Sequence, residues 1–229
     1  MELDTLQALY LEGLRDLYSA ENQLLKALPK MRKAATNPQL QDAFNTHLAQ
    51  TEQQVARLER IFEQLGKSPK GKHCKGMEGL IEEGNDLMKE DADPDVLDAG
   101  LIAAAQHVEH YEIAGYGTCR TYAELLGLDE QMDLLQQTLN EEEETDVLLT
   151  ELAMTSVNIA AMSGDEDEMS DESEGDDNGG RNSSGGGRAS GSGQKKTAGK
   201  TPAKKSMGGS RGKTSGAKRG SSAGSRSKK

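Results

Sequence analysis

The sequence predicts an all-α protein: a bundle of four long helices followed by a disordered C-terminal tail. Two observations lead to this prediction. Over most of residues 1–162, apolar side chains recur every three or four positions, which is the spacing of one face of an α-helix. After Met162 this periodicity stops, and the rest of the chain holds 16 of the 26 glycines. We therefore expect one folded domain over residues 1–162.

The charge changes sign along the chain. Residues 1–162 contain 30 acidic and 13 basic side chains, residues 163–180 contain nine acidic and no basic ones, and residues 181–229 contain fourteen basic and no acidic ones. Segments rich in Gly, Ser and charge bury too little apolar surface to offset the entropy lost on ordering. We predict an acidic disordered linker over residues 163–180 and a basic disordered tail over residues 181–229.

The first two predicted helices are separated by a short break. The first spans about residues 3–35, and its apolar face consists of Leu6, Tyr10, Leu14, Leu17, Leu24, Leu28 and Met31. Pro29 inside this helix predicts a kink or a shift in the last turn. Asn37 and Pro38 are typical of an N-cap and a first helical residue, so the second helix begins there. Gly66 is the expected C-terminal stop.

The second helix is followed by a basic loop over residues 67–76 and by a short amphipathic helix over about residues 77–89. The third long helix begins at Asp93 and Pro94 and ends near Gly127. Asp129 is the expected cap of the fourth, and the apolar face of that helix consists of Leu135, Leu139, Leu149 and Leu152. Four long helices with one long crossover between the second and third describe the ferritin-like form of the four-helix bundle.

Several classes of protein are excluded. Cys74 and Cys119 lie far apart without C-x-x-C spacing, which argues against a disulfide scaffold and a zinc site. No apolar run reaches the length of a membrane span. The acidic N-terminus lacks the basic and apolar regions of a secretory signal. We expect a cytoplasmic protein without membrane contact.

Ionisable side chains interrupt the apolar face of every long helix near its middle. The six candidates are Glu21, His47, Glu109, Glu112, Glu142 and Asp146. Buried carboxylates are costly unless they are paired or bind a cation. Oxygen-rich ligands with an imidazole suit iron or manganese better than zinc. Taken singly, each of these residues could instead lie at the edge of its stripe in water, and the run of glutamates at 141–144 must expose at least two members.

Five segments resemble the YciE/YciF family of bacterial ferritin-like proteins: DLYSAENQLLKALPKM, FNTHLAQTEQQVARLE, GMEGLIEEGNDLM, QHVEHYEIAGYGT and TLNEEEETDVLLTELA. The resemblance covers about residues 3–160, and the fourth segment is the most specific. It implies a rubrerythrin-related bundle that is often a homodimer and is associated with stress responses and metal binding. The same six ionisable residues would form its inward polar set.

Two positions depart from the family pattern. Gln50 stands where relatives often have glutamate, and the fourth helix offers Glu142 with Asp146 in place of a Glu-x-x-His motif. A neutral amide is a poorer iron ligand than a carboxylate. We predict a site that binds iron or manganese, with at most a weak ferroxidase or peroxide-handling activity and no separate catalytic residue.

The basic tail suggests a second function. Its segments KKTAGKTPAKK and SGAKRGSSAGSRSKK resemble the lysine-rich tails that contact DNA. Neutralising phosphates would give binding that is independent of sequence and sensitive to salt. Residues 181–229 contain no aromatic side chain for base stacking. The alternatives are a solubilising tail or one that folds back on the acidic bundle and on residues 165–177.

Overall fold

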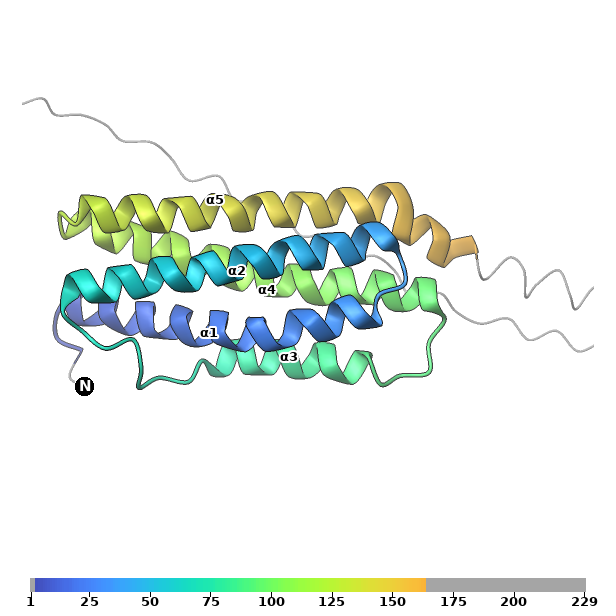
Figure 1. Cartoon of the computed structure of the whole chain (residues 1–229), viewed down its shortest axis with the longest axis horizontal. Helices are drawn as coiled ribbons and strands as arrows, with labels where there is room; N and C mark the ends of the chain where they lie inside the picture. The colour runs from blue at the N-terminus through green and yellow to red at the C-terminus, as the bar shows by residue number, and fades with distance from the viewer. Residues whose placement is uncertain (1–2, 164–229) are drawn as a thin grey trace, which may run out of the picture. The chain divides into compact units, whose positions relative to one another are not determined.

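The computed structural model describes residues 3–163 of the 229-residue chain. The four long helices run side by side (Figure 1) and are α1 (Leu6–Ala34), α2 (Pro38–Leu65), α4 (Pro94–Leu125) and α5 (Asp129–Leu152). The short helix α3 (Lys75–Leu87) lies in the crossover between α2 and α4, and α5 continues through a π-helical segment, η1 (Ala153–Val157). The predicted all-α bundle with a short crossover helix is confirmed. The predictions for the linker and the tail concern residues outside the described part.

The helix boundaries have local causes that the sequence shows. The side chain of Asn37 accepts hydrogen bonds from the first backbone amides of α2, and Pro38 is the first helical residue. Asp93 caps α4 in the same way. Gly66 ends α2 in a left-handed conformation, with a φ of 61°. Helix α1 continues through Pro29 to its end.

The starts of α3 and α5 differ from the prediction for reasons that the structure shows. Helix α3 begins at Lys75 rather than Met77, because the thiol of Cys74 accepts a hydrogen bond from the Met77 amide and caps the helix. Asp129 is the first residue of α5 and not its cap; Leu128 holds the cap position and makes no side-chain hydrogen bond there. A carboxylate in the first turn still interacts favourably with the helix dipole.

The interior consists of two apolar clusters with a polar layer between them. One cluster contains Leu28, Phe44 and Leu101, and the other contains Ile61 and Tyr116. Along each long helix, the residues of the two clusters lie on either side of the ionisable positions that the sequence singles out. Among residues 3–163, no helix has the length and apolar character needed to cross a membrane.

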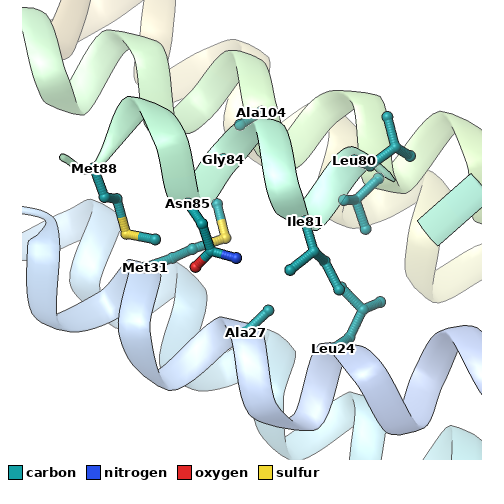
Figure 2. Close-up of a pocket in the computed structure, with 10 residues that line it drawn as sticks. Leu24, Ala27, Met31, Leu80, Ile81, Gly84, Asn85, Met88 and Ala104 are labelled. Carbon is teal, nitrogen blue, oxygen red and sulfur yellow. The ribbon is translucent and has the colours of Figure 1, made fainter. Parts of the chain in front are cut away.

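Helix α3 covers the groove between α1 and α4 over half of the bundle. Figure 2 shows Ile81 and Met88 of α3 facing Leu24 and Met31 of α1, with Ala104 of α4 behind them. The cavity between these side chains has a volume of about 10 Å³, which is at most the space of one water molecule. Helix α3 therefore packs closely on the apolar cluster that contains Leu28.

Candidate metal centre

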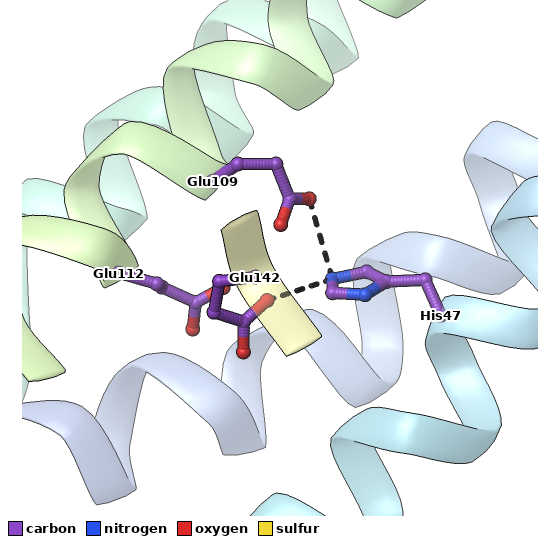
Figure 3. Close-up of side chains that lie close together, drawn as sticks. All are labelled: His47, Glu109, Glu112 and Glu142. Carbon is purple, nitrogen blue, oxygen red and sulfur yellow. Dashed lines mark ion pairs between the residues drawn. The ribbon is translucent and has the colours of Figure 1, made fainter. Parts of the chain in front are cut away.

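The structure gathers four of the six candidate residues in the polar layer. They come from three helices: His47 from α2, Glu109 and Glu112 from α4, and Glu142 from α5. One potential ligand atom from each lies within 4.8 Å of the others (Figure 3). All four side chains are buried, with at most 2% of each residue exposed.

Helical spacing and antiparallel packing bring the four side chains together. Glu109 and Glu112 are three residues apart, so they lie on one face of α4. His47 Nε2 is 3.3 Å from Glu109 Oε1 and 4.0 Å from Glu142 Oε2. In Figure 3 the imidazole of His47 points at these two carboxyl groups, and Glu112 lies beside Glu142.

Glu21 of α1 lies next to this group. It is fully buried, and its Oε1 accepts a hydrogen bond from the Tyr116 hydroxyl. Burial and the charge of Glu142 raise the pKa of Glu21 well above its ordinary value. The polar layer therefore holds an ionisable side chain from each of the four long helices.

The structure does not bring Asp146 into the group. Its side chain is 23% exposed, lies 3.3 Å from His110, and accepts a hydrogen bond of 3.1 Å from Gln106. Asp146 follows Glu142 by four residues, slightly more than one turn, and this rotates it toward the rim of the α4–α5 seam. Gln50, the departure on α2, is half-buried, and its side chain interacts with His47.

Burial sets the charge of the metal-free site. Loss of contact with water raises the pKa of Glu109 and Glu112 well above the ordinary range, and the neighbouring carboxylates add to this effect. It also raises the pKa of Glu142 to about 7 and lowers that of His47 to about 4. In the absence of a cation, the site therefore holds protons on its carboxyl groups and keeps the imidazole neutral.

The site contains an unusual concentration of unsatisfied polar atoms. Within residues 3–163, ten buried side-chain nitrogen and oxygen atoms have no hydrogen-bond partner, and eight of them belong to this site. The eight are one oxygen each of Glu21 and Glu109, both ring nitrogens of His47, and both carboxyl oxygens of Glu112 and Glu142. Buried polar atoms normally have partners. The donor set thus fits a metal ion, because oxygen and imidazole ligands converge where hydrogen bonds are lacking.

Three further residues lie next to the site and are not among the six candidates: Gln54, Arg57 and Glu141. Arg57 donates two hydrogen bonds, of 2.7 and 2.6 Å, to the carboxylate of Glu141. Gln54 is fully buried and also donates to Glu141, at 3.2 Å. The glutamate run behaves as expected in one respect, since Glu143 and Glu144 are exposed. Gln54 follows His47 by two helical turns, and this spacing in the sequence indicates that both side chains lie on the same face of α2.

Comparisons with known proteins agree with the fold and with the resemblance noted in the sequence. Residues 5–162 match the family model described as a domain of unknown function, DUF892. The protein YciF of Escherichia coli K12 is 45% identical over 159 residues, which make up 69% of this chain and 96% of YciF.

Two solved structures are also similar. The crystal structure of the E. coli stress protein YciF has a TM-score of 0.66 at 45% identity, covering 68% of this chain and 99% of that one. YcfI from Rhodopseudomonas palustris has a TM-score of 0.64 at 46% identity, covering 65% of this chain and 95% of that one. From its fold, its buried polar layer and these matches, the chain belongs to the DUF892 family and is a homologue of YciF.

Proposed function

We propose that the bundle binds a pair of divalent ions, iron or manganese. We also propose that it acts in a stress response, because the similar protein YciF is described as a stress protein. The eight buried, unpartnered ligand atoms in one layer carry this proposal. Carboxylate oxygens with one imidazole suit iron and manganese. In four-helix bundles, sites for two metal ions are built from carboxylate side chains that project inward from facing helices. The residues of this site occupy such positions.

The free oxygen atoms suggest how two ions would share the ligands. Glu112 and Glu142 each have two unpartnered oxygens, so both residues would help to hold the two ions. Glu109 and Glu21 each have one, and each of these residues would help to hold a single ion. His47 and Glu109 would hold one ion and Glu21 the other. The four carboxylates together carry four negative charges, which balance two divalent cations.

Bound iron or manganese would supply redox chemistry, namely iron oxidation or the handling of peroxide and oxygen. The protein's own groups orient the ligands and exclude water. The Tyr116 hydroxyl fixes one oxygen of Glu21 and leaves the other free. The packed apolar clusters on either side keep bulk water away from the layer. Protons leave the carboxyl groups when a cation binds.

We expect the full-length Glu112→Gln variant to retain less than half of the manganese or iron that the wild type retains after dialysis. The substitution keeps the size of the side chain and removes the charge and one ligand oxygen. Elemental analysis measures the metal content. Glu143→Gln is the matched control, because Glu143 is exposed and lies outside the site. Equal metal in wild type and Glu112→Gln, or none in the wild type, would refute the proposal.

Manganese binding should become stronger as the pH rises. The burial-raised pKa of Glu142, about 7, means that this group is mostly protonated at pH 6 and mostly ionised at pH 8. Because the ion requires the carboxylate, the affinity should rise about tenfold from this group alone. Calorimetric titration at the two pH values measures the change, and an affinity independent of pH would contradict it.

A further inference from the structure

We propose that Gln54 is a ligand of this metal centre: its amide oxygen binds the ion that Glu21 holds, and this neutral donor suits the site to divalent ions. The inference rests on the metal-binding function proposed above. Gln54 is not among the ionisable residues that the sequence or the family resemblance selects. Its burial, its orientation and its position each support the assignment.

The first support is an unpartnered oxygen with a fixed orientation. Gln54 is fully buried, and its Nε2 donates a hydrogen bond to Glu141 Oε2. The carboxylate of Glu141, paired with Arg57, only accepts hydrogen bonds. The amide nitrogen must therefore face Glu141, and Oε1 must face the other way. That oxygen is buried and has no hydrogen-bond partner.

The second support is the position of Gln54 in the bundle. Helices α1 and α2 are antiparallel around a short connection, and Glu21 precedes Ala35 by as many residues as Gln54 follows Leu40. Residues at equal distances from the connection lie at the same level, because both helices rise equally per residue. Both side chains are fully buried. Gln54 is therefore level with Glu21 on the facing helix.

The electrostatic coupling of Glu141 supports the same position. The charge of Glu141 raises the pKa of both Glu21 and Glu142. Arg57 acts on the same two carboxyl groups in the opposite direction. The pair that anchors the Gln54 amide thus acts on two of the proposed ligands. Gln54 lies on the inner side of this pair, because it is fully buried whereas Arg57 and Glu141 are partly exposed.

The chemistry of an amide fits a divalent ion. An amide oxygen is a hard, neutral ligand of the kind that suits manganese and other oxygen-loving cations. With Gln54 neutral, the four glutamates of the site balance two divalent ions. A carboxylate at position 54 would add a fifth negative charge and would favour a trivalent ion. A cation would also give the Gln54 oxygen the partner that it lacks.

Three variants of the full-length protein test the role of Gln54 by manganese titration, with calorimetry and electron paramagnetic resonance to count the bound ions. Gln54→Met removes both the oxygen and the amide N–H. Gln54→Glu keeps an oxygen and removes the N–H. Gln53→Met is the matched control, because Gln53 is exposed on the same helix. We expect the wild type, Gln53→Met and Gln54→Glu to bind two ions each. In Gln54→Met, one of the two ions should bind at least about tenfold more weakly than in the wild type.

The outcomes separate a ligand from a residue that only positions Glu141. If Gln54→Met binds two ions as tightly as Gln53→Met, the inference is wrong. It is also wrong if Gln54→Glu loses an ion as Gln54→Met does, because the lost N–H would then be the cause. A wild type that binds no manganese would instead refute the proposed function itself. Should Gln54→Met fail to fold, Gln54→Glu decides: its affinity for Ga³⁺ relative to Mn²⁺ should rise at least tenfold, and an unchanged ratio overturns the inference.

Discussion

Replacing Glu142 with glutamine will stabilise the metal-free protein by about 3 kcal/mol at pH 8. The pKa of Glu142 is raised from its ordinary value of 4.5 to about 7 by burial. A raised pKa means that the folded state binds the proton more tightly than the unfolded state. The stabilisation is therefore fully present below about pH 4.5 and is lost as the pH rises through about 7. A neutral glutamine does not undergo this loss.

Urea unfolding in the presence of a chelator measures the effect. The advantage of Glu142→Gln should shrink to less than about 1 kcal/mol at pH 5, because the wild-type carboxyl group is then protonated. Glu143→Gln, which alters an exposed neighbour, should change neither value. A Glu142→Gln variant that is less stable than the wild type at pH 8 would contradict the prediction. The same variant should bind less metal, so that stability and metal binding change in opposite directions.

Asp98→Ala will destabilise the fold by about 3–5 kcal/mol. Asp98 of α4 is 1% exposed and holds the connection between α1 and α2. One oxygen accepts a hydrogen bond of 2.9 Å from the Thr36 amide, and the other accepts bonds of 2.8 Å from the Thr36 hydroxyl and 2.7 Å from the Asn37 amide. Alanine would leave these three donors without their carboxylate partner.

Urea unfolding compares Asp98→Ala with Asp95→Ala, a change of an exposed carboxylate in the first turn of the same helix. We expect Asp95→Ala to cost less than about 1 kcal/mol, the range of an exposed charge near a helix N-terminus. Asp98→Asn should fall between the two, because it keeps one acceptor oxygen. A free energy of unfolding for Asp98→Ala within about 1 kcal/mol of the wild type would show that the connection is held by other contacts.

Much of the fold follows from local patterns. The spacing of apolar residues predicts all four long helices, and the pairs Asn37–Pro38 and Asp93–Pro94 mark the starts of two of them. The start of α3 does not follow from such a pattern, because the thiol of Cys74 is an unusual cap. Its sulfur is held 2.9 Å from the Tyr111 hydroxyl and 3.3 Å from Asp16, and no local pattern reveals these distant contacts.

The same periodicity predicts most residues of the candidate site. Five of the six selected residues are buried in the polar layer, because each lies on the inward stripe of its helix. Asp146 differs because a step of four residues exceeds one turn, and the stripe alone does not show on which side of the seam such a residue lies. The roles of Gln54 and Arg57 depend on Glu141, which is distant in the sequence, and the pattern on α2 does not disclose this contact.

Crystals of the full-length protein grown with Mn²⁺ test the central claim most directly through anomalous diffraction. We predict one anomalous peak inside the bundle between His47, Glu109, Glu112 and Glu142. A second peak should lie between Glu112, Glu142 and Glu21. Peaks confined to the protein surface, with the interior carboxyl groups hydrogen-bonded to one another, would contradict the claim that this layer is a metal centre.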